Sequence, residues 1–231
     1  MLQNLHYISE RELADWVRQH LDSAEHVLSA GYQGKTLLFQ QGEHKLVIKT
    51  PLGNPLTRPL NLALLRHEYR IYQQLDGLSA VPHCYGMANE QYLVLEYIDG
   101  QTMRDVRPAK DSGFYEKLFT AIEQMHQRGV AHFDLKRKEN LLVAAGDQPV
   151  IIDFGVSIYH KGGWHLLNAF LFKLAKQFDY NAWIRHKYDR KYEQMNADDQ
   201  PYYRKTLIEN ISLKSKRFYK DRIKKFFRSP K

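Results

Sequence analysis

Two carboxylates and an amide stand close together in the middle of the chain. Residues 130–155 read V-A-H-F-D-L-K-R-K-E-N-L-L-V-A-A-G-D-Q-P-V-I-I-D-F-G and contain Asp134, Asn140 and Asp153. Two short apolar runs, residues 141–143 and 150–152, are joined by a G-D-Q-P turn, and this pattern predicts a hairpin. Mg²⁺ prefers hard oxygen ligands and takes one or two carboxylates together with phosphate oxygens. We therefore expect the mouth of this hairpin to bind a divalent metal and a substrate hydroxyl.

The same stretch resembles the catalytic loop and the magnesium motif of the protein-kinase-like superfamily. H-F-D-L-K followed by Asn140 is similar to H-x-D-L-K with its downstream Asn, and D-F-G follows as it does in kinases. The resemblance implies an α+β, two-lobed fold with an antiparallel-sheet N-lobe, one inward helix, and a shortened, mostly helical C-lobe. It also implies ATP and Mg²⁺ as cofactors.

The resemblance assigns roles to four residues of this stretch. Asp134 is expected to orient the attacking hydroxyl, and Lys136 to neutralise the transferred phosphoryl group. Asn140 and Asp153 are expected to hold Mg²⁺. Because the transition state of phosphoryl transfer is loose, Asp134 acts as a positioning group more than as a strong base, and no raised pKa is required.

Three departures from the kinase pattern bear on metal binding, on regulation and on the acceptor. Asn140 lies one residue further from Asp134 than in D-L-K-P-E-N, so the loop bulges or the metal ligation differs. Phe133 replaces the arginine of H-R-D, which removes the charge that pairs with a phosphorylated activation loop. No A-P-E follows Gly155, and an apolar helical pattern begins at Trp164, so we expect no peptide-docking segment. This shortening resembles the RIO kinases and the Kdo/WaaP-type kinases of lipopolysaccharide sugars.

The phosphate-holding half is expected near the N-terminus. Short β-type runs at residues 26–28, 36–40 and 46–49 predict two hairpins, and the first turn contains Gly31 and Gly34. Residues 29–36, S-A-G-Y-Q-G-K-T, match a P-loop except for Ser29 and equally match the end of a kinase glycine-rich flap. A P-loop must run into a helix, whereas residues 37–41 have the pattern of a second strand. The context favours the flap.

A lysine and a glutamate are expected to form an ion pair beside the flap. Lys49 ends L-V-I-K, which resembles the V-A-I-K strand whose lysine contacts the α- and β-phosphates. Residues 60–75 have a helical pattern that places Glu68 on the same face as Leu65 and Tyr72. A carboxylate on an apolar face is costly unless it is paired. We therefore predict a Lys49–Glu68 pair that orients the lysine.

The link between the two lobes is expected at residues 91–98. This apolar strand ends at the turn signal Asp99-Gly100. By the resemblance, backbone groups of Glu96 and Ile98 bond the adenine edge of ATP. A helix that Asp111 and Ser112 can cap then delivers the chain to the catalytic stretch.

Length and composition set the domain plan. The 231 residues with 43% hydrophobic content form a core and exclude a disordered chain. Ser9 and Glu12 form a capping box that begins an amphipathic helix. We predict this helix in residues 1–23, packed on an N-lobe of residues 24–98, with a C-lobe of residues 99–231.

Cys84, the one cysteine, cannot form an intramolecular disulfide and fits a reducing compartment. With no apolar run of about 18 residues and no signal pattern, a cytoplasmic protein is expected.

The positive charge is concentrated in the C-terminal tail. Nine of the 34 Lys and Arg residues but one of the 26 acids lie in residues 213–231, so the rest of the chain is balanced. Apolar residues recur at helical spacing from about 211 to 231, which predicts a basic amphipathic helix. Such a helix fits the inner face of an anionic membrane, plain packing on the lobe or, less well, nucleic acid.

Three function classes follow from the sequence. The first is an ATP-dependent kinase acting on protein Ser/Thr, which D-L-K and D-F-G favour. The second is a lipopolysaccharide inner-core sugar kinase, which the shortened C-lobe favours. The third is a nucleotide-binding pseudokinase that works as an interaction module; Lys49, Asp134 and Asp153 argue against it, and the displaced Asn140 argues for it.

Overall fold

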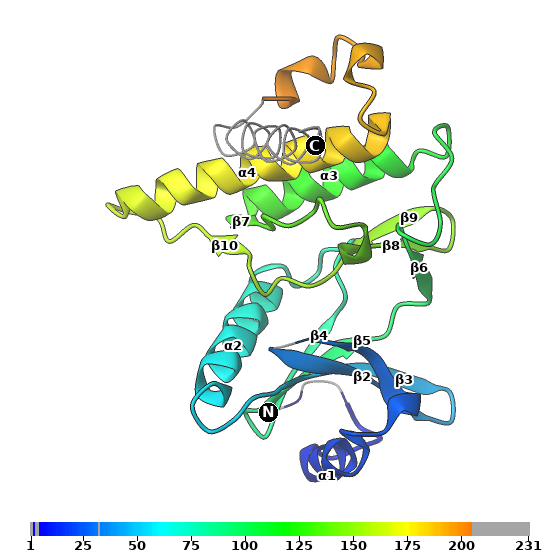
Figure 1. The fold of residues 1–231 in the computed structure, drawn as a ribbon, viewed down its shortest axis with the longest axis vertical. Coiled ribbons are helices and arrows are strands. Elements are labelled where there is room, and N and C mark those ends of the chain that lie inside the picture. Colours follow the sequence, from blue (N-terminus) through cyan, green and yellow to red (C-terminus); the bar gives the residue numbers. More distant parts are fainter. Residues whose placement is uncertain (1, 3–4, 32, 205–231) are drawn as a thin grey trace, which may run out of the picture.

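The structure is a computed structural model that describes residues 2, 5–31 and 33–204. The chain folds into two lobes, with a β-sheet in one and most of the helix in the other (Figure 1). None of the helices in this described part is long and apolar enough to cross a membrane. The predicted basic helix at about residues 211–231 lies outside the described residues.

A five-stranded antiparallel sheet forms the N-lobe. Its strands are β1 (Val27–Ala30), β2 (Gly34–Gln41), β3 (His44–Pro51), β4 (Cys84–Ala88) and β5 (Tyr92–Glu96). The spatial order is β1-β2-β3-β5-β4. A 3₁₀ turn, η1 (Ala24–His26), stands where the sequence pattern predicted the start of the first strand. Because β1 pairs antiparallel with β2, the next strand in the chain, the glycine-containing segment belongs to a hairpin and not to a P-loop.

Two helices cover this sheet. Helix α1 (Glu10–His20) begins with the predicted capping box, in which the Ser9 hydroxyl accepts from the Glu12 amide. Leu13 and Val17 of α1 are fully buried in one cluster with the sheet residues Leu37 and Ile48. Helix α2 (Arg58–Gln74) has a proline in its first turn and contacts β3, β4 and β5.

The C-lobe combines small strands with two long helices. Strands β6 (Gly100–Thr102), β8 (Leu141–Ala144) and β9 (Gln148–Ile151) form one antiparallel sheet, and β7 (Val130–Ala131) pairs with β10 (Ile158–Tyr159). Helix α3 (Phe114–Gln127) packs against α4 (Leu166–Tyr188). The 3₁₀ turns η2 (Lys138–Asn140), η3 (Tyr192–Gln194) and η4 (Gln200–Tyr202) complete the described elements.

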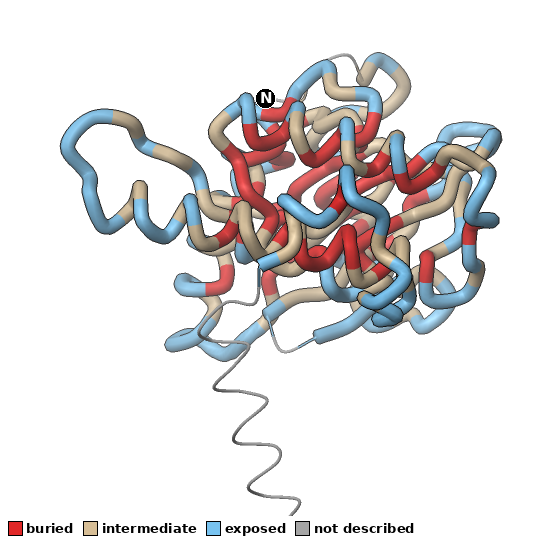
Figure 2. The backbone as a smooth tube through the Cα atoms, turned by 90° about the horizontal axis from the view of Figure 1, so that it is seen from above, coloured by how far each residue is buried: buried red, intermediate tan, exposed pale blue. Residues whose placement is uncertain are grey.

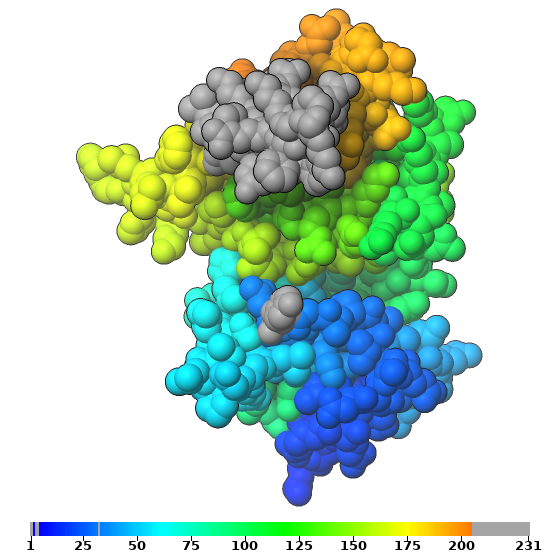
Figure 3. Space-filling view, viewed as in Figure 1, coloured from blue at the N-terminus to red at the C-terminus, as the bar shows by residue number. Residues whose placement is uncertain are grey.

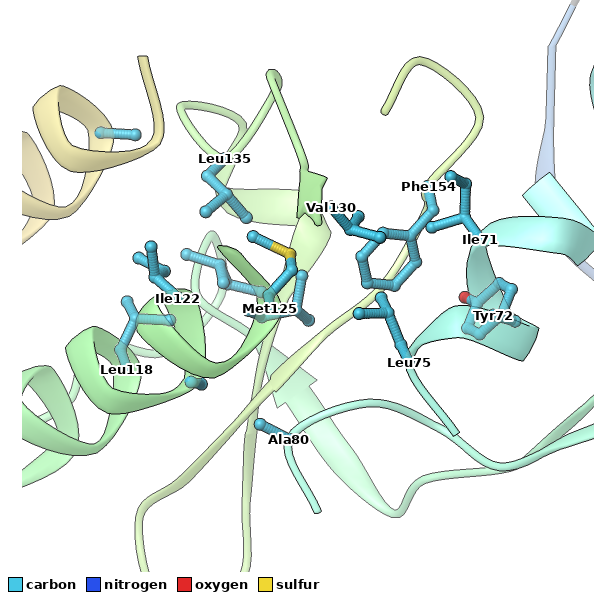
Figure 4. Close-up of a cluster of buried hydrophobic side chains, with 14 of the residues drawn as sticks. Ile71, Tyr72, Leu75, Ala80, Leu118, Ile122, Met125, Val130, Leu135 and Phe154 are labelled. Carbon is cyan, nitrogen blue, oxygen red and sulfur yellow. The ribbon is translucent and has the colours of Figure 1, made fainter. Parts of the chain in front are cut away.

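One hydrophobic core runs through both lobes. It joins Ile71 and Tyr72 of α2 to Ile122 and Met125 of α3, and Phe154 of the D-F-G segment lies between them (Figure 4). The ring of Phe154 packs edge-on against Tyr72 with centroids 5.0 Å apart. In Figure 2 the buried backbone is a continuous central band with exposed loops around it. The lobes are therefore packed together at the D-F-G segment.

The expected architecture, an antiparallel N-lobe with one inward helix and a mostly helical C-lobe, is the one observed. One local prediction was wrong. Gly113, and not Asp111 or Ser112, is the N-cap of α3, because the helix begins at Phe114; the Ser112 hydroxyl instead accepts from the Phe114 amide at 3.4 Å. The apolar helical pattern expected from Trp164 forms α4, which begins at Leu166 and continues to Tyr188, where Ala182, Trp183 and Ile184 are buried. The domain limits 1–23, 24–98 and 99–231 stay a prediction.

Candidate functional site

The carboxylate of Glu68 joins three segments at the contact between the lobes. The Lys49 ammonium lies 2.5 Å from Glu68 Oε1, so the predicted ion pair is present. Glu68 Oε1 also accepts a hydrogen bond from the Phe154 amide at 3.1 Å. Lys49 Nζ reaches Asp153 Oδ1 at 3.1 Å. One buried carboxylate thus connects β3, α2 and the D-F-G segment.

Mutual charge keeps Lys49 and Asp153 ionised despite burial. Burial alone lowers the pKa of Lys49, but the negative charges of Glu68 and Asp153 outweigh it and the pKa lies above its usual value. Burial alone raises the pKa of Asp153, but the Lys49 charge outweighs it and the pKa lies below its usual value. At neutral pH the site therefore presents a cation and an anion side by side, as phosphate and metal binding require.

The backbone of the catalytic loop is held by a buried carboxylate from α4. The amides of His132 and Phe133 each donate to Asp179 at 2.8 Å, one to each carboxylate oxygen. His126 Nε2 lies 3.0 Å from Asp179 Oδ2. Phe133 has φ +70°, a conformation that a bulky residue adopts only when its surroundings impose it. Asp179, which is 0% exposed, supplies that constraint.

The imidazole of His132 places Asp134. Its Nε2 donates to the Ile152 carbonyl oxygen at 3.0 Å, and its Nδ1 accepts from the Asp134 amide at 3.3 Å. Burial raises the pKa of Asp134, against the opposing charges of Lys136 and Arg137. Asp134 and Asp153 are therefore carried by backbone segments that one histidine ties together.

The extra residue before Asn140 is absorbed by two successive turns. The Arg137 amide donates to the Asp134 carbonyl oxygen at 3.3 Å, and the Asn140 amide donates to the Arg137 carbonyl oxygen at 3.1 Å. Asn140 Nδ2 then donates to the Asp134 carbonyl oxygen at 3.1 Å. The longer loop accordingly still brings Asn140 against Asp134.

The donor set fits Mg²⁺. Asn140 makes its hydrogen bond to Asp134 through Nδ2, which leaves Oδ1 available to a metal ion. Asp153 has φ +68°, and its side chain is 48% exposed. Among the described residues no group of three or more His, Cys, Asp or Glu side chains forms a metal cage. Mg²⁺ is typically bound by one or two protein oxygens together with phosphate oxygens, and one carboxylate with one amide oxygen match that pattern.

Of the two glycines of the flap, Gly34 has a structural reason to be glycine, whereas a Cβ on Gly31 would meet nothing within 4 Å. A Cβ on Gly34 would lie 2.5 Å from the Thr50 carbonyl oxygen, so the close approach of β2 and β3 excludes a side chain there. The Gly31 amide donates to the Gly34 carbonyl oxygen at 2.9 Å. That amide is already bonded in the hairpin, and phosphate contact by Gly31 and Gly34 stays a prediction.

The hinge residues differ in what their backbones offer. The Glu96 amide donates to the His83 carbonyl oxygen at 2.8 Å, and the Glu96 carboxylate accepts from the His83 amide at 2.9 Å. Ile98, in contrast, has no backbone hydrogen bond within the part of the chain that the structure describes. The peptide groups of Ile98 are therefore the better candidates for an adenine edge.

A basic groove opens beside Asp134. It has a volume of about 830 Å³, and three segments line it: the stretch after β6, the catalytic loop and the end of α4. Arg137, on its wall, lies 4.0 Å from Asp134 Oδ2. The lining side chains are Met103, Arg104, Arg107, Lys136, Arg137, Lys138, Glu139, Arg185, His186, Asp189 and Arg190.

The groove has more positive charge than its own acids neutralise. Glu139 is paired with Arg104 and Asp189 with Arg107, both at 3.1 Å. The remaining cations Lys136, Lys138, Arg185 and Arg190 form no ion pair with any carboxylate of residues 2, 5–31 and 33–204. Such a surface attracts anions.

Asp179 and His186 are the site residues that sequence reasoning missed. Asp179 is the only acid between Asp153 and Asp189, in a helix whose other charged residues are all basic, and this isolation was the available signal. His186 Nε2 lies 2.8 Å from the Leu135 carbonyl oxygen. Burial and then the charges of Arg185 and Lys138 lower the pKa of His186 to about 4.

Comparison with known proteins agrees with this geometry. The sequence model of the family "Protein kinase domain" matches residues 40–175, more than half of the chain. A maternal embryonic leucine zipper kinase of Xenopus tropicalis is 35% identical over 140 residues, which cover 54% of this chain and 20% of that protein. The serine/threonine-protein kinase D of Synechocystis is 34% identical over 84 residues, 33% of this chain and 16% of that protein.

A third relative has the same pattern of coverage. The NUAK family SNF1-like kinase 2 of Rattus norvegicus is 29% identical over 146 residues, 58% of this chain and 23% of that protein. The chain thus spans about a fifth of the length of these curated relatives.

We predict that Asp179→Asn loosens the catalytic loop. An amide has one acceptor oxygen, so its NH₂ group would face a backbone N–H of His132 or Phe133, at a cost of about 1–3 kcal/mol in the free energy of unfolding. Urea unfolding measures the cost. Asp198→Asn is the control, because Asp198 is exposed. Equal stability of the two variants would contradict the role given to Asp179.

We also predict an acid-sensitive stability that depends on His186. The folded pKa of about 4 lies below the unfolded value of 6.5. The unfolded state therefore binds the proton first, so stability is complete above pH 6.5, falls as the pH drops and levels off below about 4, losing on the order of 3 kcal/mol. Urea unfolding between pH 7 and pH 4 measures this. His186→Gln should flatten the pH dependence of the free energy of unfolding between pH 7 and pH 4. An unchanged slope in this variant would disprove the role given to His186.

Proposed function

The chain belongs to the protein kinase domain family, and on that premise we propose that it transfers the γ-phosphate of ATP to an alcohol. The observation that carries the proposal is the assembly of Lys49, Glu68 and Asp153 next to a positioned Asp134. A pseudokinase transfers no phosphate, so it does not require Lys49, Glu68 and Asp153 to be assembled beside Asp134. The enzyme interpretation is therefore preferred to that of a nucleotide-binding interaction module.

In this proposal each residue acts by position and charge. Asp134 accepts a hydrogen bond from the acceptor hydroxyl and takes its proton as the new oxygen–phosphorus bond forms and the bond to the β-phosphate oxygen breaks, releasing ADP. Lys49, held by Glu68, contacts the α- and β-phosphates. Asn140 and Asp153 would hold Mg²⁺, which supplies charge neutralisation between the phosphates. Lys136 stands on the acceptor side and balances charge on the transferred group.

A protein serine or threonine is the first candidate acceptor. Its support is the similarity to relatives such as a serine/threonine-protein kinase. The family match covers residues 40–175, which include the residues proposed here for nucleotide and metal, a part that kinases with different acceptors share. We place the reaction in the cytoplasm, where ATP is available.

A sugar hydroxyl of the lipopolysaccharide inner core is the second candidate. The observation that favours it is the basic groove, which holds four cations without a carboxylate partner among the described residues and suits an acceptor that carries phosphate groups. The chain between Gly155 and α4 is short, and its β10 pairs back onto β7, so it supplies no extended platform for a peptide. Attachment of the basic tail to an anionic membrane, or less readily to nucleic acid, stays a prediction.

Phosphotransfer should depend on Asp134. Asp134→Asn keeps the size and removes the proton acceptor, and we expect the transfer rate to fall by about 10²–10⁴-fold with ATP binding retained. Incubation with labelled ATP, Mg²⁺ and either a protein mixture or purified lipopolysaccharide core measures this. Asp111→Asn is the control, because Asp111 is exposed. If label enters neither acceptor, or if both variants label equally, the proposal that the chain is a phosphotransferase is refuted.

The groove should determine the affinity for an anionic acceptor. For the triple variant Lys138→Gln, Arg185→Gln, Arg190→Gln we expect the KM for the lipopolysaccharide core to rise at least about tenfold, with the KM for ATP unchanged. Arg11→Gln, Arg70→Gln, Lys110→Gln removes the same charge at exposed positions elsewhere and is the matched control. An unchanged acceptor KM in the groove variant would favour the protein acceptor.

A further inference from the structure

An exposed apolar segment follows the D-F-G motif. Of the ten large hydrophobic side chains that are exposed in the described part of the chain, seven lie between residues 156 and 171. Trp164 is 95% exposed, Leu166 77% and Leu167 72%. The full set is Val156, Tyr159, Trp164, Leu166, Leu167, Phe170 and Leu171. Apolar surface gathered in this way marks a site of interaction and not ordinary scatter.

The segment is a built element and not a loose loop. Gly162 and Gly163, at φ +69° and +62°, turn the chain into α4. Asn168 of α4 pins that turn, because its Oδ1 accepts from the Lys161 amide at 2.8 Å and its Nδ2 donates to the Tyr159 carbonyl oxygen at 2.9 Å. Figure 3 shows this end of α4 projecting beyond the body of the C-lobe.

The apolar side chains share a face. Leu166, Leu167, Phe170 and Leu171 recur at intervals of three and four residues, which places them along one side of the first turns of α4. Trp164 lies two residues before α4 and is the most exposed of the set. The start of α4 therefore presents two aromatic side chains, Trp164 and Phe170, together with leucines.

The charge of the segment selects one kind of partner. Residues 154–178 contain no Asp or Glu, whereas they contain Lys161, Lys173 and Lys176. An apolar face bordered by lysines suits an anionic lipid surface, in which apolar side chains enter the boundary of the acyl chains and cations meet the headgroups. Trp is favoured at such boundaries. The chain's own residues 205–231 carry ten bases and two acids and so offer no charge complementarity to these lysines.

We propose that residues 156–171 dock this protein on an anionic bilayer surface, with Trp164, Leu167 and Phe170 entering the interface and Lys161 and Lys173 contacting headgroups. The proposal is independent of the phosphotransfer proposed above. Because α4 also carries Asp179, which holds the catalytic loop, docking at its first turns fixes the orientation of that loop relative to the bilayer.

Vesicle binding by the full chain tests the proposal. The protein is sedimented with vesicles of phosphatidylcholine containing phosphatidylglycerol and with vesicles of phosphatidylcholine alone. We expect binding to the anionic vesicles, a drop of at least about tenfold in the partition coefficient for the variant Trp164→Ser, Leu167→Ser, Phe170→Ser, and a smaller drop for Lys161→Gln, Lys173→Gln. Leu28→Ser, Leu56→Ser, Leu60→Ser removes the three remaining exposed large hydrophobic side chains of residues 2, 5–31 and 33–204 and should bind like the unaltered chain.

A spectroscopic readout locates the contact. Lipids brominated in the acyl chain should quench the fluorescence of Trp164, and Trp164→Phe should remove that quenching while binding persists. Trp183 is 2% exposed and is a poor reporter of the lipid.

Three results would overturn the proposal. In the first, the triple serine variant of Trp164, Leu167 and Phe170 binds vesicles as well as the unaltered chain does, which would assign binding to another part of the protein. Another is absence of quenching in the bound protein. The third is self-association through the segment without vesicle binding, measured by analytical ultracentrifugation, which would make it a protein interface.

Discussion

The contact on which the two lobes depend is the buried carboxylate of Glu68. It lies at the centre of α2 with 5% of its side chain exposed, and it holds both the Lys49 ammonium and the Phe154 amide. A carboxylate in this position is stable only because these partners offset its loss of hydration. The strand with the lysine and the segment with Asp153 therefore cannot separate from α2 without leaving a buried charge unpaired.

A second buried carboxylate does the corresponding work in the C-lobe. Asp179 accepts from two consecutive amides of the catalytic loop and holds Phe133 in a conformation that the residue would not adopt alone. Neither Glu68 nor Asp179 needs to touch a substrate. Both fix backbone and side-chain positions, which is what phosphoryl transfer through a loose transition state demands of a protein.

Helix α4 links the separate surfaces of the C-lobe. Its first turns present the exposed apolar segment, its middle supplies Asp179, and its end contributes Arg185 to the basic groove. A rigid helix transmits position over its length, so a surface bound at one end has a defined relation to the groove at the other.

The sequence by itself determined the elements whose signals are local: the hairpins, the capping box of α1 and the pairing of Lys49 with Glu68, because a carboxylate on an apolar helix face demands a cation. The two-lobed α+β plan followed from the resemblance of its motifs to those of kinases. The tertiary structure alone decided the rest. Asp179 reaches a loop more than forty residues earlier in the chain, the groove forms from three separated segments, and Gly34 is explained by the carbonyl of a neighbouring strand. Periodicity and motif spacing describe neighbours along the chain, whereas these contacts depend on which distant segments packing brings together.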